Sequence, residues 1–308
     1  MIFYNDRVKL KIGTRGSPLA LAQSRWVESR LKEISPSLET EIIIIKTSGD
    51  LFQNQSPKEA HEASLSPQGT KGLFVKEIEE GLLKGEIDLA VHSAKDMPAQ
   101  IPNGLHILAY PQRESPQDIF IGQNGISWKE IKPGQTIGTS SLRRQIQLKM
   151  VFPEVNVLPL RGNVDTRLKK LEEKSLDGII LAAAGLKRLG REISSAHLID
   201  LDQMVPSPGQ GALAIESRTQ DDLRLFSQIL DHGPTRISVE WEREFLKTVG
   251  GGCSTPLGAL AEIKAEGLEV RVFWAQENGA HAKRLKSFCK DTSLKDSFIQ
   301  DLARQVKS

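Results

Sequence analysis

The chain has 308 residues, which is enough for two or three domains that each bury a core. Its 41 Lys and Arg against 39 Asp and Glu leave a formal net charge of only +2, so any basic stretch is a local feature. This balance argues against a nucleic-acid-binding protein and favours a small acidic ligand. No apolar run approaches the length of a membrane span, and the start, MIFYNDRVKLKIG, lacks the apolar region of a signal peptide.

The two cysteines, Cys253 and Cys289, are too few for a disulfide framework and predict a reducing compartment, most simply the cytoplasm. Cys253 stands in GGGCSTP, whose glycines predict an exposed and flexible loop. A thiol there, near a cationic cleft, would be a nucleophile with a lowered pKa, but an incidental cysteine fits the pattern as well. No cysteine or histidine lies at ligand spacing from Cys253, so we expect no metal site.

From its beginning the chain alternates strands and helices. Residues 8–12 predict a strand, and Ser17 and Pro18 then cap and open an amphipathic helix that runs to Ile34. The β-branched run at 41–46 predicts a strand buried on both faces. Residues 48–70 show no strong periodicity, which indicates a lid or a disordered excursion.

Polar residues follow the next predicted strand. A helix over 72–85, expected to bury Leu73, Phe74, Ile78, Leu82 and Leu83, leads to the strand 87–91. His92, Ser93, Lys95 and Asp96 come directly after this strand. The ends of strands are where α/β proteins place their chemistry. An Asp beside a Lys is also typical of a turn or a surface ion pair, so function and structure both remain open for this pair.

The stretch 138–170 is the most informative part of the sequence. It contains seven Lys or Arg against two acids, and twice a strand (136–138 and 155–160) leads into an amphipathic helix that begins with arginine. Arginine at a helix N-terminus is unfavourable by about 0.3 to 1 kcal/mol, so we expect an anion opposite, such as a carboxylate or a phosphate. A solvated basic helix face is the alternative for either junction, but two junctions in one unit favour an anion site. The first N-cap is expected at Thr139, Ser140 or Ser141, and the second at Asn163 or Asp165.

The remaining elements complete two α/β units and a third, smaller one. A strand over 179–183 and a helix that carries Arg188 finish the second unit, and VPSPGQG at 205–211 resembles a linker back to the first. Two short crossings between two units predict paired lobes with the ligand between them and the linkers as hinges. After a helix over 235–249, three short strands and a last helix predict a small α+β domain.

Eight segments of the sequence resemble, in order, the signature segments of the porphobilinogen deaminase family, also called hydroxymethylbilane synthase. They are GTRGSPLALAQ (13–23), KGLFVKEIE (71–79), VHSAKDMP (91–98), GTSSLRRQ (138–145), RGNVDTRL (161–168), LAAAGLKRLG (181–190), PGQGALAIE (208–216) and GGCSTPLG (251–258). Two departures stand out: the stretch 50–70 is longer than the family pattern, and Ser217 replaces a cysteine that often follows the GQG strand.

The resemblance implies a fold, α/β with two lobes like a type II periplasmic binding protein plus a small C-terminal α+β domain. The expected domains are 1–111 with 212–231, then 112–211, then 232–308, the last carrying the cysteine. It also implies a cytoplasmic, monomeric transferase of heme and porphyrin biosynthesis. This enzyme joins four porphobilinogen units, releases ammonia at each step and yields the linear tetrapyrrole hydroxymethylbilane.

The resemblance further implies site residues. The cofactor would be a dipyrromethane held by a thioether on Cys253, and Asp96 would be the catalytic carboxylate that stabilises a cation left by the loss of ammonia. The residues expected to bind the cofactor are Ser93, Lys95, Thr139, Ser140, Ser141, Arg143, Arg144, Arg161, Asn163, Arg167 and Arg188. Those expected to bind substrate are Arg15, Ser17, Lys71, Arg161, Arg167 and Arg188. Arginines suit this task because every pyrrole unit carries an acetate and a propionate.

Two other functions are consistent with parts of the pattern. A two-lobed receptor for a small dicarboxylate or phosphate would share the fold, but it would need neither Asp96 nor a cysteine arm and usually carries a secretion signal. A nucleic-acid-binding protein could use the patch at 138–170, but the aromatic platforms and net basicity typical of that class are missing. The expected partner is therefore the small molecule porphobilinogen, with no nucleic acid and no membrane.

Overall fold

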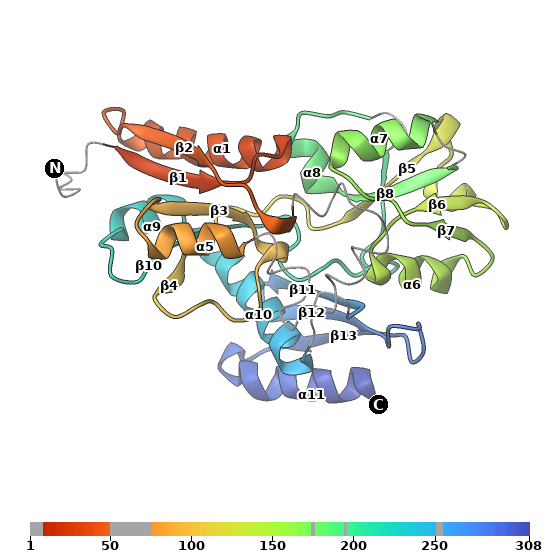
Figure 1. Cartoon of the computed structure of the whole chain (residues 1–308). Coiled ribbons are helices and arrows are strands. Elements are labelled where there is room, and N and C mark those ends of the chain that lie inside the picture. Colours follow the sequence, from red (N-terminus) through yellow and green to blue (C-terminus); the bar gives the residue numbers. More distant parts are fainter. Residues whose placement is uncertain (1–8, 50–74, 174–175, 194–195, 251–254) are drawn as a thin grey trace. The chain divides into compact units, whose positions relative to one another are not determined.

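The computed structural model describes residues 9–49, 75–173, 176–193, 196–250 and 255–308. The chain separates into two compact units, residues 1–112 with 213–236 and residues 113–212 with 237–308. The elements of both units are labelled in Figure 1. In the described part of the chain, no helix combines the length and the apolar character needed to cross a membrane.

The first unit is built on a five-stranded sheet with the order β2-β1-β3-β10-β4. Its strands are β1 (Leu10–Thr14), β2 (Thr40–Ile44), β3 (Leu89–Ser93), β4 (Leu105–Ala109) and β10 (Leu213–Arg218). β1 is parallel to β2 and β3, whereas β10 runs antiparallel to β3 and β4. The carboxyl ends of β1 and β3 therefore lie at the same edge of the sheet.

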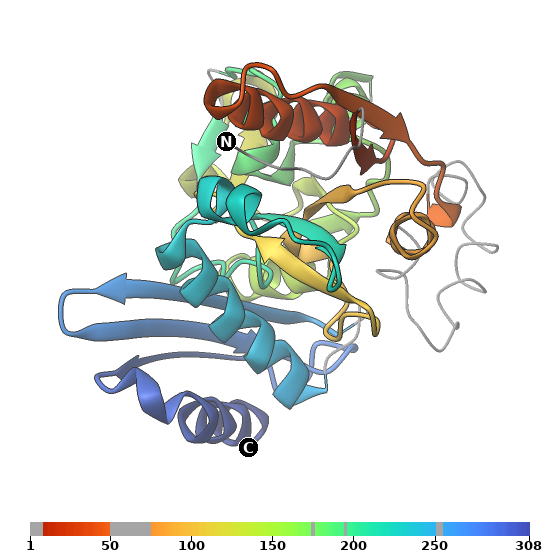
Figure 2. The same cartoon turned by 90° about the vertical axis from the view of Figure 1, so that its left-hand side faces the viewer.

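Helices cover both faces of this sheet. Helices α1 (Pro18–Ile34) and α9 (Arg224–Leu230) pack on one face, where Val27, Leu31 and Phe226 join the core formed by alternate residues of β1, β3 and β10. Helix α5 (Lys76–Leu83) packs on the other face, where Ile78 and Leu82 contact Ala90. Figure 2 shows α1 and α9 beside the strands of this unit.

The second unit repeats the pattern with a sheet of order β7-β6-β8-β5-β9. Its strands are β5 (Asp118–Gly122), β6 (Thr136–Gly138), β7 (Asn156–Leu158), β8 (Gly178–Ala182) and β9 (Ala196–Leu198). β6 is parallel to β7 and β8, and β5 runs antiparallel to β8 and β9. Helices α6 (Leu142–Val151), α7 (Val164–Glu173) and α8 (Ala183–Arg188) follow β6, β7 and β8.

A small α+β portion completes the second unit. Helix α10 (Gly233–Val249) leads to an antiparallel sheet of β11 (Leu257–Lys264), β12 (Gly267–Trp274) and β13 (Lys283–Cys289), and α11 (Lys295–Lys307) closes the chain. The rings of Trp241 on α10 and Phe298 on α11 lie 5.8 Å apart. Four short 3₁₀ turns complete the described elements: Ala94–Asp96, Gln123–Gly125, Trp128–Glu130 and Thr292–Leu294.

These observations confirm the predicted fold class of two α/β lobes and a small C-terminal α+β domain. Each five-stranded sheet includes one antiparallel strand that follows a crossing between lobes, which is the arrangement of a type II periplasmic binding protein. The exact division into three domains, at the boundaries given above, stays a prediction.

Two details of the sequence analysis are wrong, and β9 was not anticipated. The strand expected to be buried on both faces is β2, which lies at the edge of its sheet and is mostly half-buried, because no further strand covers it. Leu83, expected in the core, is 50% exposed at the end of α5. The lid expected over 48–70 falls largely in 50–74, outside the described residues.

Candidate active site

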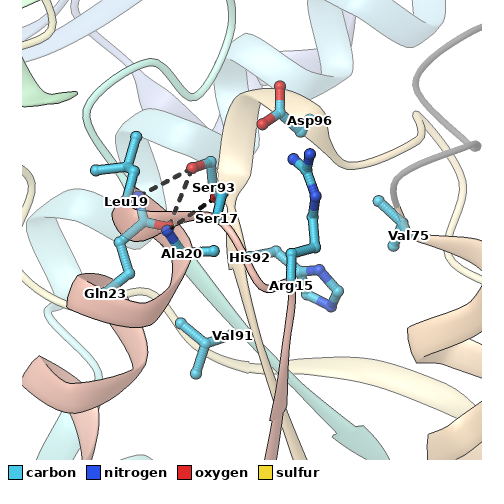
Figure 3. Close-up of a pocket in the computed structure, with 10 residues that line it drawn as sticks. All are labelled: Arg15, Ser17, Leu19, Ala20, Gln23, Val75, Val91, His92, Ser93 and Asp96. Carbon is cyan, nitrogen blue, oxygen red and sulfur yellow. Dashed lines mark hydrogen bonds between the residues drawn. The ribbon is translucent and has the colours of Figure 1, made fainter. Parts of the chain in front are cut away.

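A pocket opens at the carboxyl ends of β1 and β3 in the first unit. It encloses about 430 Å³ of space that opens to solvent, and its lining includes Arg15, Ser17, Gln23, His92, Ser93 and Asp96. Because β1 and β3 are parallel neighbours, residues far apart in the sequence meet at this edge. Four of the predicted site residues, Arg15, Ser17, Ser93 and Asp96, are therefore brought into one pocket (Figure 3).

Local structure fixes the first half of this pocket. β1 ends at Thr14, and Ser17 caps α1 as predicted, because its hydroxyl accepts a hydrogen bond from the amide of Ala20 at 3.3 Å. Pro18 occupies the first turn of the helix, where its missing N–H costs nothing. Arg15 is thus held between a strand end and a helix start.

The second half comes from β3 and the 3₁₀ turn that follows it. Ser93 ends the strand, and its hydroxyl accepts a hydrogen bond from the side-chain amide of Gln23 at 3.0 Å, which ties the turn to α1. The turn Ala94–Asp96 then carries Lys95 and Asp96, both partly exposed. In Figure 3 the guanidinium of Arg15 points toward the carboxylate of Asp96. The pocket can therefore offer a cation to an acidic ligand and a carboxylate to a developing positive charge.

A buried polar pair lies at the base of this pocket. The Nε2 atom of His92 lies 3.0 Å from a carboxylate oxygen of Glu216 on β10, and both side chains are almost fully buried. Glu79 on α5 is also buried, and burial together with the charge of Glu216 raises its pKa to about 7. Sequence analysis placed His92 at the strand end but missed both glutamates. The signal that could have revealed Glu216 is a charged residue inside the apolar run ALAIES (212–217).

The second unit has a comparable edge. The carboxyl ends of the parallel strands β6, β7 and β8 meet there, and the helices α6, α7 and α8 begin just beyond them. The amide of Thr139 donates to the carbonyl of Leu158 at 2.9 Å, so the first two junctions are neighbours. Thr139 is buried, Ser140 is exposed and Ser141 is half-buried.

The structure shows which residues cap the helices at these junctions. The side chain of Asn163 accepts hydrogen bonds from the amide and the hydroxyl of Thr166, both at 2.8 Å, so Asn163 and not Asp165 caps α7. Ser141 stands at the N-cap position of α6 without a side-chain cap bond, and the hydroxyl of Thr139 accepts from its amide at 3.3 Å instead.

Arg143 and Arg144 have an arrangement that the sequence did not predict. Both guanidinium groups are buried and bind Asp118, the first residue of β5, with N–O distances of 2.7 Å. Arg143 also donates to the carbonyl of Val205, and Arg144 to that of Ile180. The protein itself thus supplies an anion opposite the arginines.

The electrostatics of this ion-pair cluster explain why it is stable. Burial opposes the charge of Asp118, but the two arginines outweigh it and hold the pKa of this carboxyl well below its ordinary value. Gln210 adds a hydrogen bond from its side-chain amide at 2.9 Å. Because Asp118 pairs with Ala182, the last residue of β8, the cluster lies at the same edge of the sheet as the helix starts.

The other predicted arginines lie around this edge. Arg161 is exposed, and Arg167 is half-buried with its Nε donating to the carbonyl of Gly162 at 2.8 Å. Arg188 donates to the carbonyl of Gly211 at 2.7 Å, and its burial lowers its pKa to about 10, which leaves it charged at neutral pH. The structure thus gathers Thr139, Asn163, Arg161 and Arg167 at neighbouring junctions.

Two predicted residues, Cys253 and Lys71, lie outside the described residues. Cys289 is described, and it is a buried free thiol at the end of β13 whose pKa is raised by burial. Within the described ranges, no three His, Cys, Asp or Glu side chains are grouped so that they could hold a metal ion.

Comparison with known proteins assigns most of the chain. A family model described as "Porphobilinogen deaminase, dipyromethane cofactor binding domain" matches residues 10–225, and one described as "Porphobilinogen deaminase, C-terminal domain" matches residues 237–299. Curated relatives named porphobilinogen deaminase include the proteins of Syntrophomonas wolfei, 42% identical over 96% of this chain and 94% of its own, and Thermus thermophilus, 47% identical over 83% and 81%. The Bacillus subtilis protein of the same name is 46% identical over 83% and 80%.

Solved structures give weaker likenesses. The VFT2 domain of BvgS from Bordetella pertussis has a TM-score of 0.39 at 15% identity and covers 73% of this chain and 84% of its own. YhfZ from Shigella flexneri has a TM-score of 0.36 at 14% identity and covers 81% and 99%. The family models and the relatives carry the assignment: this chain belongs to the porphobilinogen deaminase family.

Proposed function

We propose that this chain joins four porphobilinogen units head to tail, with the reaction at the Asp96 pocket, and releases hydroxymethylbilane. As a member of its family the chain is a transferase that makes a tetrapyrrole from porphobilinogen with a dipyrromethane cofactor. The observation that supports the site most directly is the meeting of Arg15, Ser17, Ser93 and Asp96 in one pocket. Such a pocket suits a substrate that carries both carboxylates and an aminomethyl group.

The role of each group follows from its charge. Asp96 is the catalytic carboxylate, because the loss of ammonia from porphobilinogen leaves a cation that a fixed negative charge stabilises. Arg15 is charged and points into the pocket, so it pairs with an acetate or propionate of the substrate. For the substrate, Ser17 adds a hydroxyl and Lys71 a further cation. Ser93 and Lys95 bind the cofactor. The carboxylates of the substrate then fix the pyrrole, while its reacting carbon faces Asp96.

The cofactor is a polyanion, and the second unit has the donors to hold it. Helices α6 and α7 begin at neighbouring junctions with Ser140, Ser141 and Asn163, and Arg161 and Arg167 lie beside them. When bound, the dipyrromethane supplies a pyrrole end to which new units are added. We propose that Thr139, Arg143, Arg144 and Arg188 complete this site and that Cys253 carries the thioether.

The net charge and the cysteine content of the chain support a proposal for its cellular compartment and its partners. We propose that it works in the cytoplasm, with no nucleic-acid or membrane partner, because its formal net charge is only +2 and its thiols are suited to a reducing compartment. That it works as a monomer is proposed from the family resemblance alone.

Turnover of porphobilinogen by the purified protein tests this function. We expect release of ammonia and of hydroxymethylbilane, and the release of hydroxymethylbilane depends on Asp96. A protein that binds porphobilinogen but releases neither product would refute the proposed function.

A further inference from the structure

Three titratable side chains meet on the α5 face of the first sheet. His92 on β3 and Glu216 on β10 lie on this face, and their side chains are 3.0 Å apart with exposed fractions of 4% and 0%. Glu79, 8% exposed, lies on α5, and burial and then the charge of Glu216 raise its pKa. These three residues are called the buried acid cluster below.

The cluster is not fully satisfied by hydrogen bonds. One carboxylate oxygen of Glu79 and one of Glu216 are buried and have no hydrogen-bond partner among the described residues. A buried carboxylate without partners is expensive to ionise, and a second negative charge nearby adds to the cost. The burial of Glu79 and its unpartnered oxygen therefore favour the protonated form of this side chain.

The charged side chains around the cluster are the alternatives to a proton on Glu79. Arg218, the last residue of β10, forms ion pairs with Asp88 and Asp221, with N–O distances of 3.2 and 2.7 Å. These two carboxylates balance its positive charge. The other charged or titratable side chains on the elements next to α5 are Arg15 after β1, Asp96 after β3, Lys11 on β1 and His106 on β4. The cluster is thus separate from the Arg218 ion pairs.

His92 connects the cluster to the pocket. It lines the cavity together with Arg15 and Asp96 (Figure 3). Its Nε2 contacts the carboxylate of Glu216. A negative charge added to the cluster therefore lies beneath the place where we put the cation formed by the loss of ammonia. Two unit charges about 10 Å apart, at an effective dielectric constant of about 20, change a barrier by on the order of tenfold.

We propose that Glu79 carries a proton beneath the Asp96 pocket, next to the His92–Glu216 pair, and that loss of this proton accelerates the condensation as the pH rises through neutrality. The inference rests on the proposed function, which places the reaction at this pocket. Glu79 and Glu216 are positioning residues, because they act through His92 and through charge and do not contact the substrate. Raised by burial and by Glu216, the pKa of Glu79 lies near 7, in agreement with this pH range.

Two measurements on the holoenzyme test the inference. The first follows the carboxyl ¹³C resonances of labelled glutamate from pH 5 to pH 9 in the parent, in Glu79→Gln and in Glu80→Gln, the last being an exposed neighbour on α5 that pairs with Lys84. The second records kcat for porphobilinogen over the same pH range. We expect a carboxyl that titrates near pH 7 and a rise of kcat by about tenfold through that pH in the parent and in Glu80→Gln. Glu79→Gln should lose both and stay near the low-pH rate.

The outcomes separate the cluster from the proposed function. A Glu79→Gln enzyme that keeps the rise of kcat, or a parent without a glutamate that titrates between pH 6 and 8, would overturn the inference while leaving the deaminase function intact. A purely structural role of Glu79 would lower stability without changing the shape of the pH profile, which also contradicts the proposal. A parent that makes no product refutes the proposed function and the rate effect together, even if the carboxyl titrates.

Discussion

At the scale of single residues, the most informative finding is the burial of Arg143 and Arg144 on Asp118. Sequence analysis interpreted arginines at a helix start as a demand for an external anion, yet a carboxylate 25 residues earlier in the chain meets part of that demand. Asp118 opens the apolar strand DIFIG, and nothing in the local sequence reveals that this strand lies beneath α6. The pairing depends on the order of strands in the sheet, which local patterns do not specify.

The first prediction concerns Arg144. Replacing it with Leu leaves Asp118 buried with only one of its two arginines, and breaking a buried pair of this kind costs about 3 to 5 kcal/mol. Urea unfolding should show this loss. Arg191→Leu is the control, because the Arg191–Asp165 pair is exposed and should contribute under about 1 kcal/mol. Equal stability losses in the two variants would contradict the structural role of the Asp118 cluster.

The second prediction concerns Asp96. Asp96→Asn keeps the size of the side chain but removes its charge, so kcat should fall by roughly 10² to 10³ with little change in thermal stability. Steady-state kinetics with porphobilinogen measure this. Asp222→Asn, at an exposed site paired with Arg224, serves as the control and should leave kcat unchanged. If Asp96→Asn stays within a few-fold of the parent, another group stabilises the cation.

The third prediction concerns Glu79 and the dependence of stability on pH. Its pKa is raised in the folded state, from an ordinary 4.5 to about 7, by burial and then by the charge of Glu216. The folded protein therefore binds this proton more tightly than the unfolded chain, and stability is lost as the pH rises from about 4.5 to 7. Glu79→Gln should show a smaller drop in Tm between pH 5 and pH 7.5 than the parent. An equal drop in both proteins would show that Glu79 is ionised in the folded state at acid pH.

At the scale of elements, strand-to-helix junctions organise both units. Local sequence predicted these junctions well, because capping residues, Pro18 and apolar periodicity act over a few positions only. It predicted Ser17 as a cap and left Asn163 and Asp165 as alternatives, of which the structure selects Asn163. Prediction from local sequence failed where the position of a strand in the sheet determines its burial or its existence. β2 is an edge strand despite its apolar run, and β9 has only three residues.

The fourth prediction concerns the cap of α7. Asn163→Ala removes the two hydrogen bonds from Thr166 and should destabilise the protein by about 1 kcal/mol. Asn163→Asp keeps a side-chain acceptor at the helix N-terminus and should be close to the parent in stability. Chemical unfolding of the three proteins makes the comparison. If the Ala and Asp variants lose the same stability, the cap does not contribute.

At the scale of the whole molecule, the ordered motifs of the sequence were sufficient to predict the fold class and the family. Arg15, Ser17, Ser93 and Asp96 were each predicted as site residues, and the parallel pairing of β1 and β3 explains why they meet in one pocket. The glutamates of the buried acid cluster were missed, because a carboxylate inside a strand becomes interpretable only when its neighbours across the sheet are known. Lys71 and Cys253 lie outside the described residues, so their roles remain proposals.

The central claim is that this chain extends a pyrrole primer held covalently on Cys253. The most direct test is the intact mass of the purified protein under denaturing and reducing conditions, with peptide mapping, before and after brief exposure to porphobilinogen. The account predicts an added mass of two pyrrole units at Cys253, because a thioether survives reduction, and further additions of one unit each after exposure. Cys253→Ser should carry no such adduct, whereas Cys289→Ser should carry it fully. An unmodified chain that still releases hydroxymethylbilane, or an adduct at Cys289, would contradict the account.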